Sequence, residues 1–292
     1  MSILADAKNI KALALDLDGT LLAPGSVLTE RTVRAIKTCR RRGLKIIIAT
    51  GRAIEATLPI ITALGADGPV ICYNGAAVAD MPGAKILSTT LLARDAAAFC
   101  VDLSRETGVY YQIFVPCGNL SNGNLSDTDK KGGRIVLMAE QDAPEREMYY
   151  KHTGILAELC DLKEVLGCRE VPGCVKTMFM AEPEVQTALR SRLNEHFGKN
   201  IYITRTLYNF LEIMDVKVSK GQGLKFAMEH YGIKSEEVIA FGDEENDLPM
   251  FAAAGFSAAP LNAKDTVKAA ANLVIGSNAE DGVAVFLEEF FG

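Results

Sequence analysis

The chain has 292 residues, more than a single domain usually contains, so two domains or one domain with a large insertion are expected. Hydrophobic residues make up 49% and charged residues 23% of the chain, which is typical of a globular protein with ample core. The net charge of −6 argues against binding to nucleic acid or to an anionic membrane surface.

The first part of the chain alternates short apolar runs with helical patterns. We expect strands at residues 11–17, 44–49 and 69–73. One helix is expected to begin after an N-cap at Thr29, to close with the basic cluster 37–42 and to stop at Gly43. A second helix covers residues 54–64, with Pro59 as a possible kink. Strands that alternate with helices predict βαβ units and a parallel sheet.

The C-terminal part returns to the same alternation. Its predicted helices cover residues 220–231, 247–254 and 281–291, and its predicted strands cover residues 238–242 and 273–275. These elements extend the α/β pattern of the N-terminal part.

The middle of the chain has a different texture. Its predicted helices are residues 93–107, 153–166 and 184–197, and its predicted strands are residues 109–115, 135–139, 175–181, 201–205 and 210–214. Residues 116–133 are rich in Gly, Asn, Ser and Asp, which indicates an exposed loop. Neighbouring strands flanked by helices indicate an α+β unit with an antiparallel sheet. We therefore expect one core domain, residues 1–84 and 212–292, interrupted by a domain of residues 85–211.

The cysteines and histidines indicate neither a disulfide framework nor a zinc site. The seven cysteines form no Cys-x-x-Cys pair, and the three histidines have no ligand-like spacing. Reduced thiols suit a cytosolic protein. No signal-type apolar core begins the sequence and no segment reaches a membrane-spanning length, so a cytoplasmic protein is expected.

The most informative residues are two acids that follow the first predicted strand. Asp16 and Asp18 stand two positions apart, and Gly19 and Thr20 then turn the chain away. Two anions so close together repel each other, so one must take a proton or both must share a cation. A carboxylate beside a divalent cation can attack phosphorus, and a second can transfer the proton of the leaving oxygen. The alternative is that the Asp-Gly pair only starts a turn.

Two further motifs follow the same logic. Thr50, Gly51 and Arg52 end the second predicted strand, where a hydroxyl and a backbone N–H can bind a phosphate oxygen. Lys220 stands just before or at the start of a predicted helix and could neutralise charge on a transferring phosphoryl group. The alternatives are a helix N-cap at Thr50 and a surface lysine at 220.

The last motif lies at the end of the predicted strand 238–242. Asp243, Glu244, Glu245, Asn246 and Asp247 follow it, and hard oxygen ligands suit Mg²⁺. A solvated acidic turn is the alternative. Active sites of open parallel sheets lie outside the carboxyl ends of the strands, and all four motifs are expected there.

Taken together, these motifs resemble the haloacid dehalogenase (HAD) superfamily of phosphohydrolases, with all four of its sequence motifs in order. The resemblance is greatest to the Cof-type branch, in which a cap (class IIB) is inserted between the second and third motifs. Here that gap runs from Arg52 to Ser219, and Asn74 to Ala76 are similar to the entry of the cap. The resemblance implies an α/β fold with a Rossmann-like parallel-sheet core and an inserted α+β cap domain that governs substrate specificity.

The resemblance also implies a role for each site residue. Asp16 is the nucleophile that forms an aspartyl-phosphate, and Asp18 is the general acid/base that offers its backbone carbonyl to Mg²⁺. Asp243 completes the metal site with Asp16. Thr50, with Gly51, binds the transferring phosphoryl group and Lys220 steadies it, so Thr50 and Lys220 are catalytic as well as substrate-binding. The substrate-binding residues are Thr50, Gly51, Arg52, Asn74, Lys220 and Asn246. Asp247 supports either Lys220 or the metal-bound waters.

The resemblance is looser in two places. The segment from Phe256 to Ala263 departs from the family's usual glycine-rich pattern and keeps only Asn262 and Ala263. The predicted cap, including residues 116–133, is similar to the family only in outline, and it is the part that decides the substrate.

The sequence thus predicts a Mg²⁺-dependent phosphatase that hydrolyses a small phosphorylated metabolite, with a sugar phosphate preferred. A phosphosugar mutase is the first alternative, and a non-catalytic binding or regulatory protein on the same scaffold is the second. The expected partner is a small-molecule phosphate ester, without nucleic acid or membrane. The sequence does not indicate an oligomeric state.

Overall fold

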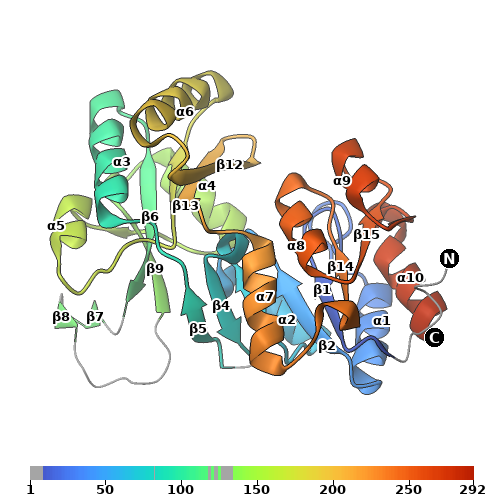
Figure 1. The fold of residues 1–292 in the computed structure, drawn as a ribbon. Coiled ribbons are helices and arrows are strands. Elements are labelled where there is room, and N and C mark those ends of the chain that lie inside the picture. Colours follow the sequence, from blue (N-terminus) through green and yellow to red (C-terminus); the bar gives the residue numbers. More distant parts are fainter. Residues whose placement is uncertain (1–8, 82, 118–119, 122–123, 126–133) are drawn as a thin grey trace. The chain divides into compact units, whose positions relative to one another are not determined.

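The structure is a computed structural model that describes residues 9–81, 83–117, 120–121, 124–125 and 134–292 (Figure 1). The chain forms two compact units. The first comprises residues up to Leu87 together with Ser219–Gly292, and the second is Ser88–Val218.

The first unit is built on a largely parallel sheet. Its order among the described residues is β16-β15-β14-β1-β2-β3-β4-β5. The strands are β1 (Ala12–Leu15), β2 (Lys45–Ala49), β3 (Val70–Cys72), β4 (Ala77–Asp80), β5 (Lys85–Thr89), β14 (Val238–Phe241), β15 (Phe256–Pro260) and β16 (Leu273–Ile275). The strands from β16 to β3 are parallel to their neighbours, whereas β4 is antiparallel to β3.

Helices cover both faces of this sheet, because its central strands are apolar on both sides. Alternate side chains such as Ala12, Ala14 and Ile47 pack against α7 (Lys220–Tyr231), α8 (Leu248–Ala253) and α9 (Asp265–Ala270). On the other face, the ring of Phe241 lies 5.6 Å from that of Phe286 on α10 (Gly282–Phe291). Helix α1 (Glu30–Arg41) contacts α10 and α2 (Ile54–Leu64). The predicted α/β layering is confirmed.

Local signals place the first helix as predicted. The side chain of Thr29 accepts a hydrogen bond from the backbone N–H of Thr32, which caps the start of α1. Arg40 and Arg41 close its last turn, where cations suit the helix dipole. Helix α2 runs through Pro59 over its full predicted length.

The second unit is an α+β domain with its own sheet, ordered β10-β9-β6-β11-β13-β12. The strands are β6 (Tyr111–Cys117), β9 (Arg134–Ala139), β10 (Glu158–Leu159), β11 (Lys176–Met180), β12 (Ile201–Leu207) and β13 (Phe210–Asp215). All described pairs are antiparallel except β9 with β10. The antiparallel sheet is as predicted.

Three helices of this unit build its apolar core, and a fourth packs elsewhere. Residues of α3 (Arg94–Thr107), α5 (Leu162–Gly167) and α6 (Pro183–Phe197) pack with Ile113, Phe179 and Leu211 of the sheet. Tyr149 of α4 (Pro144–Thr153) lies against the rings of Phe114 and Phe210. Since Phe114 alternates with Ile113, α4 covers the opposite face.

Several expectations about elements are wrong. The predicted helix 153–166 is wrong over most of its length. Helix α4 was not expected and ends at Thr153, because Gly154 after it has a left-handed φ of 75°; β10 then follows, and the helix resumes only at α5, whose start Asp161 caps. Strands β4, β5 and β15 were not expected, and β15 consists mostly of small residues that carry little strand signal.

The boundaries of the insertion also differ from the prediction. A boundary at 211/212 would cut β13 (Phe210–Asp215), which pairs with β11 from Phe210 to Ile213 and with β12 up to Asp215, with a register shift between Arg205 and Leu207 of β12. The second unit therefore extends to Val218, and it starts at Ser88 rather than at residue 85. The predicted loop 116–133 lies largely outside the described residues. Of those described there, residues 116–117 end β6, and the others form β7 (Leu120–Ser121) and β8 (Asn124–Leu125).

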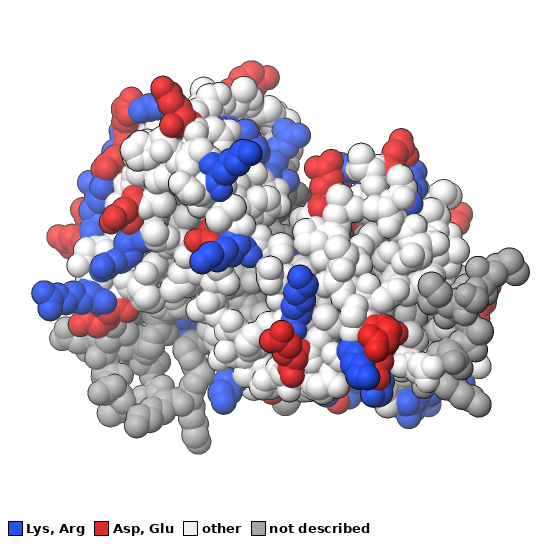
Figure 2. All heavy atoms as spheres, viewed as in Figure 1, with Lys and Arg blue, Asp and Glu red and all other residues white. Residues whose placement is uncertain are grey.

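Three further observations concern the chain as a whole. The six cysteines whose side chains are described are free. In the described part of the chain, no helix combines the length and the apolar character needed to cross a bilayer. On the face seen in Figure 2, acidic and basic side chains of the described residues are intermixed.

Candidate active site

The candidate site is assembled from the ends of neighbouring parallel strands. Asp16 directly follows β1, Thr50 directly follows β2, and Asp243 lies two residues beyond β14. Strand β1 pairs with both β14 and β2, so the three residues meet at one edge of the sheet. This edge, outside the carboxyl ends of the strands, is where open α/β sheets bind ligands.

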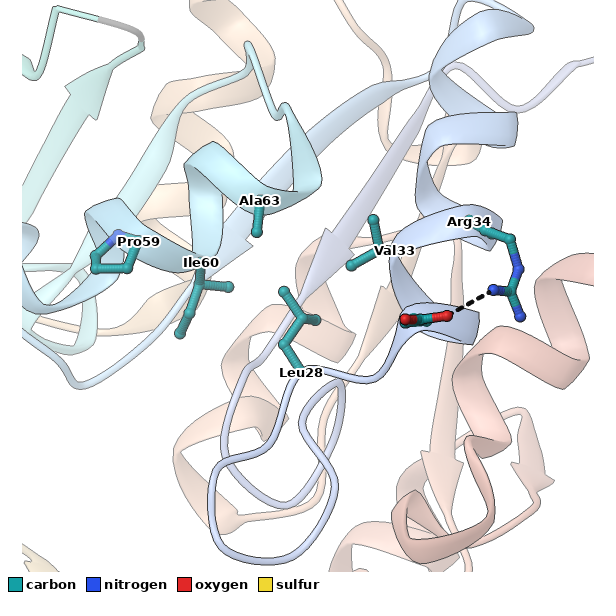
Figure 3. A pocket seen from close by; sticks show the side chains of 7 residues that line it. Leu28, Val33, Arg34, Pro59, Ile60 and Ala63 are labelled. Carbon is teal, nitrogen blue, oxygen red and sulfur yellow. Dashed lines mark hydrogen bonds and ion pairs between the residues drawn. The ribbon is translucent and has the colours of Figure 1, made fainter.

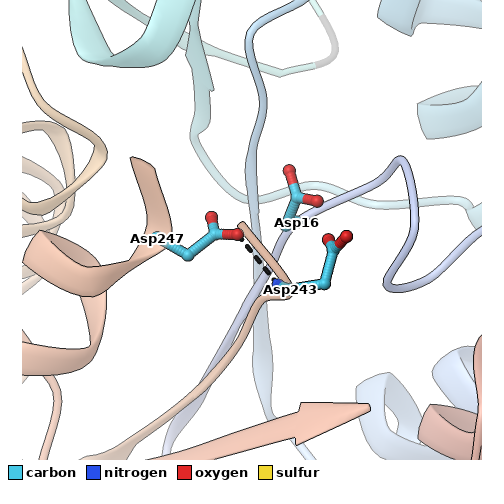
Figure 4. A group of neighbouring side chains, drawn as sticks. All are labelled: Asp16, Asp243 and Asp247. Atoms are coloured by element: carbon cyan, nitrogen blue, oxygen red, sulfur yellow. Dashed lines mark hydrogen bonds between the residues drawn. The ribbon is translucent and has the colours of Figure 1, made fainter. Parts of the chain in front are cut away.

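Three aspartates form a buried cluster at this edge. Carboxylate oxygens of Asp16, Asp243 and Asp247 lie within 4.8 Å of one another (Figure 4). The second carboxylate oxygen of Asp247 accepts hydrogen bonds of 3.0 Å from the backbone N–H groups of Asp243 and Glu244. Asp247 therefore fixes the turn that presents Asp243.

Lys220 is the cation of this cluster. Its Nζ donates to Asp16 Oδ1 and to Asp247 Oδ1, both at 2.6 Å, and its side chain is only 2% exposed. Ser219 caps the start of α7 by accepting from the backbone N–H of Gln222, which places Lys220 in the first turn. Asp247 thus contacts Lys220, the partner named in the first of the two alternatives for this residue.

Burial and the mutual charges of the cluster shift the pKa values of its members. Burial raises the pKa of Asp16 well above its usual range; Lys220 opposes this rise, whereas Asp247 and Asp243 add to it. Burial likewise raises the pKa of Asp243 to about 6. Burial disfavours a charged lysine, but Asp16 and Asp247 outweigh it and raise the pKa of Lys220. One lysine thus faces three carboxylates, a net negative site suited to a further cation.

The turn after β1 is shaped to meet Asp243. Thr20 donates from Oγ1 to Asp243 Oδ1 over 2.7 Å, and both residues are buried. Gly19 has a φ of +81°, and a Cβ there would stand 2.2 Å from Asp243 Oδ2. Only glycine fits this close, left-handed position. The sequence suggested a turn at these residues, but not the contact of Thr20 with Asp243.

Asp18 lies outside the aspartate cluster. Strand β1 ends at Leu15, so both acids lie on the following turn, and the Asp18 carboxylate has partners of its own. Arg52 donates from Nε to Oδ2 at 2.7 Å and from Nη2 to Oδ1 at 2.5 Å, and Ser26 donates to Oδ1 at 2.9 Å. Burial works to raise the pKa of Asp18, but the Arg52 hydrogen bonds and charge outweigh it, and the pKa is lowered.

Two asparagines lie next to the cluster. Asn74 is fully buried with a φ of 57°, a left-handed conformation that asparagine tolerates, and its backbone N–H donates to Thr50. Its Oδ1 accepts from Asn246 Nδ2 at 3.0 Å. A Cβ built on Gly51 would come within 3.0 Å of Asn74 Oδ1. The second and fourth motifs are therefore joined through Asn74.

The loop after the fourth motif shares only Asn262 and Ala263 with the family. The side chain of Asn262 forms hydrogen bonds with two other segments of the first unit. Its Nδ2 donates to the carbonyl of Gly19 over 2.8 Å, and its Oδ1 accepts from the backbone N–H of Asn278. It ties the turn after β1 to the segment before α10.

An apolar hollow elsewhere on the first unit offers no comparable chemistry. It lies between α1 and α2, as Figure 3 shows, and is lined mainly by Leu28, Val33, Pro59, Ile60 and Ala63. Its charged groups, Glu30 and Arg34, pair with each other at its rim over 3.4 Å. The aspartate cluster is thus the better candidate for a reactive site.

The structure brings the expected residues into three connected groups. Asp16, Lys220 and Asp243 share the cluster with Asp247; Thr50, Gly51, Asn74 and Asn246 adjoin it; and Asp18 pairs with Arg52. Thr20 was expected only as part of the turn after Asp18, and Ser26 was not expected at the site; the run Asp18-Gly19-Thr20 contained a signal for Thr20, and no pattern indicated Ser26.

Comparison with known proteins identifies the family. The model of the haloacid dehalogenase-like hydrolase family matches residues 13–287. The pyridoxal phosphate phosphatase YbhA of Escherichia coli is 30% identical over 293 residues, which cover 95% of this chain and 97% of that protein. The 5-amino-6-(5-phospho-D-ribitylamino)uracil phosphatase YwtE of Bacillus subtilis is 29% identical over 294 residues, 96% of this chain and 98% of that protein.

A solved structure agrees with the sequence relatives. A crystal structure from Thermotoga maritima has a TM-score of 0.79 and 27% sequence identity, and covers 96% of this chain and 97% of that one. The chain belongs to the haloacid dehalogenase-like hydrolases, as a phosphatase of the Cof type.

Proposed function

We propose that this phosphatase is Mg²⁺-dependent and hydrolyses a small phosphorylated metabolite through an aspartyl-phosphate on Asp16. The observation that carries the proposal is the position of Asp16. It is buried at the end of β1, its Oδ1 is held by Lys220, and Asp243 stands beside it. A carboxylate fixed in this way has one oxygen oriented by the lysine and a second oxygen for bonding to phosphorus.

The donor set of the site fits Mg²⁺. The side chains of Asp16 and Asp243 and the backbone carbonyl of Asp18 are the ligands we propose, all of them hard oxygens. Burial raises the pKa values of Asp16 and Asp243 and the neighbouring carboxylates add to the rise, so a bound cation would stabilise both as anions. When bound, Mg²⁺ would neutralise the carboxylates and the incoming phosphate. Asp247 is committed to Lys220 and to two backbone N–H groups, so we assign it an orienting role.

Asp16, Asp18 and Lys220 each have a role in the two chemical steps of hydrolysis. In the first step, an Asp16 oxygen bonds to phosphorus and the ester P–O bond breaks. Because Arg52 and Ser26 lower the pKa of Asp18, Asp18 must take up a proton before this step, and it then gives that proton to the leaving oxygen. In the second step, water bonds to phosphorus and passes a proton to Asp18, and the bond from phosphorus to Asp16 breaks to release phosphate. Lys220 holds positive charge against the phosphoryl oxygens throughout.

The other residues of the site are assigned to binding. Thr50 and Gly51 are proposed to receive the phosphoryl group at the end of β2, with Asn74 and Asn246 beside them. We keep Arg52 as a binding residue, and its guanidinium also pairs with Asp18.

The substrate class we propose is a sugar phosphate or a closely related ester. One relative acts on a uracil that carries a phosphorylated ribityl chain, an ester of sugar origin, and another acts on pyridoxal phosphate. We further propose that the second unit, Ser88–Val218, acts as the cap that selects among such esters. The free cysteines support a reducing, cytoplasmic location.

The test is phosphate release from p-nitrophenyl phosphate with and without Mg²⁺. We expect turnover that needs Mg²⁺ and is abolished in Asp16→Asn, whereas Asp265→Asn, an exposed acid on α9, leaves it unchanged. A panel of sugar phosphates, pyridoxal phosphate and the ribitylaminouracil phosphate then ranks substrates by kcat/KM. Formation of an isomeric phosphate ester without free phosphate would show a mutase instead. No release from any ester would refute the proposal.

A further inference from the structure

The short turn that carries Ser26 lies against the residue proposed to carry the proton. Ala23 and Val27 exchange two backbone hydrogen bonds, of 2.9 and 3.2 Å, which close a tight loop over Pro24, Gly25 and Ser26. Residue 22, just before this loop, is tied to the turn after β1 by a hydrogen bond of 2.8 Å from Leu22 N–H to Leu17. The loop is thus held at a fixed distance from Asp18.

Ser26 is held in an unusual backbone conformation. Its φ is 59°, in the left-handed region that a serine seldom adopts and that costs free energy relative to glycine. The conformation turns its hydroxyl to Asp18 Oδ1, at 2.9 Å, while the same hydroxyl accepts from Arg52 Nη2, also at 2.9 Å. The neighbouring Gly25 also has a positive φ, of 77°, but Ser26 is the residue of the two whose side chain contacts Asp18 and Arg52, which supports a functional hypothesis for it.

The side chains of Asp18, Arg52 and Ser26 form a closed ring of hydrogen bonds. Oδ1 accepts from both Arg52 and Ser26, which fills its two acceptor positions, whereas Oδ2 accepts only from Arg52 Nε among the described residues. Arg52 is itself anchored, because its carbonyl accepts from the backbone N–H of Tyr73 over 3.0 Å. The carboxylate is thereby held in one orientation, with one acceptor position left, on Oδ2.

We infer that Ser26 is a positioning residue for proton transfer: with Arg52 it orients Asp18 so that Oδ2 exchanges the proton with the leaving oxygen. This inference rests on the proposed function, in which Asp18 protonates the leaving group. Ser26 acts through Asp18 and touches no substrate atom. Its effect should therefore depend on how much the leaving group needs a proton.

Two aryl phosphates whose leaving groups differ in acidity separate this role from a general loss of structure. p-Nitrophenol leaves readily as an anion, whereas phenol is a poorer leaving group and needs the proton more. We therefore compare kcat/KM for p-nitrophenyl phosphate and phenyl phosphate, since this constant covers the steps up to departure of the alcohol. Ser26→Ala removes the hydroxyl and keeps the strain, Ser26→Gly removes both, and Pro24→Ala in the same turn is the matched control.

We expect both Ser26 variants to lower kcat/KM for phenyl phosphate about tenfold, the effect of losing a hydrogen bond to a charged group. For p-nitrophenyl phosphate the decrease should stay within about twofold, and Pro24→Ala should change neither constant. In an Asp18→Asn background, Ser26→Ala should have no further effect, because the two residues act as one unit.

Equal losses for both esters, or no loss for phenyl phosphate, would overturn the inference about Ser26. The same holds for a full Ser26→Ala effect in the Asp18→Asn background. By contrast, a wild-type protein that cleaves neither ester with Mg²⁺ would refute the proposed function itself. Unfolding curves of the variants confirm that each is folded, and Ser26→Gly keeps the test valid if alanine is poorly tolerated at the left-handed position.

Discussion

Replacing Lys220 by methionine tests whether one buried cation holds the aspartate cluster together. Methionine keeps much of the length and volume of the side chain but removes the ammonium group. The Nζ of Lys220 lies 2.6 Å from both Asp16 Oδ1 and Asp247 Oδ1, and these three side chains are at most 7% exposed. The variant therefore leaves three carboxylates within 4.8 Å of one another without their lysine.

The size of the effect follows from these contacts. Removing one partner of a buried ion pair typically costs about 3–5 kcal/mol, because the other charge stays buried without compensation. Two carboxylates lose a partner here, so we expect a loss at the upper end, about 5 kcal/mol at pH 7 without metal. A domain of this size loses roughly 2–4 °C of Tm per kcal/mol, which predicts a decrease of about 10–20 °C.

The loss should depend on pH with a definite sign. Without Lys220, the folded-state pKa of Asp16, which burial already raises, rises further above the unfolded value of about 3.9. A group with a raised folded pKa contributes stability below its unfolded pKa, and that stability is lost as pH rises through the folded pKa. The difference between Lys220→Met and wild type should therefore be small near pH 4–5 and largest at pH 7 and above.

Denaturant unfolding at pH 5 and pH 7, in EDTA and in Mg²⁺, measures both parts of the prediction. Lys264→Met is the matched control: Lys264 pairs with Glu244 over 2.8 Å, but both side chains are half exposed. Such a pair contributes less than about 1 kcal/mol. The reasoning fails if Lys220→Met unfolds within about 1 kcal/mol of wild type at pH 7, or if its loss is the same at both pH values.

Three further outcomes follow from the same site. Thr20→Val removes the 2.7 Å hydrogen bond to Asp243, which should cost about 1–3 kcal/mol in denaturant unfolding and weaken Mg²⁺ binding in calorimetry. Thr20→Ser should retain the stability and the Mg²⁺ affinity of wild type, and equal behaviour of the two variants would contradict the contact. Burial raises the pKa of Asp243 to about 6, so a proton competes with Mg²⁺ for its carboxylate. The Mg²⁺ affinity measured by calorimetry should therefore fall up to about tenfold per pH unit below pH 6 and level off above it. A Mg²⁺ affinity independent of pH would count against Asp243 as a ligand. Gly75→Ala should destabilise the fold by more than about 3 kcal/mol in denaturant unfolding, because Gly75 has a φ of +103° and a Cβ there would stand 2.1 Å from the carbonyl oxygen of Ser219. Gly83 has open space around it, so Gly83→Ala should unfold like wild type.

Much of the core could be predicted because its signals are local. The isoleucine run of β2 and the N-cap at Thr29 depend on a few neighbouring residues, and both elements lie where they were expected. The weakest predictions fell where local signals are poor. The small residues of β15 carry little strand preference, and the two helices α4 and α5 are short.

The motif residues met at one edge for a similar reason. Parallel strands place their carboxyl ends on the same side of the sheet, so acids that follow β1 and β14 must come close once these strands pair. The sequence alone therefore determined that Asp16 and Asp243 would share a site with the residues after β2. It also determined that the core would be interrupted by an α+β insertion, because the middle segment replaces the strict alternation of strands and helices with neighbouring strands flanked by helices.

Only the tertiary structure decided which side chains pair within that site. Arg52 and Ser26 lie 34 and 8 residues from Asp18, and nothing in their local pattern shows that both reach its carboxylate. Likewise, Asp247 could have faced solvent in an acidic turn, yet it is buried against Lys220, 27 residues away. Local periodicity specifies the element on which a residue lies. The partner of a polar side chain depends on how loops close and which rotamers pack, and these are settled only when the whole core forms.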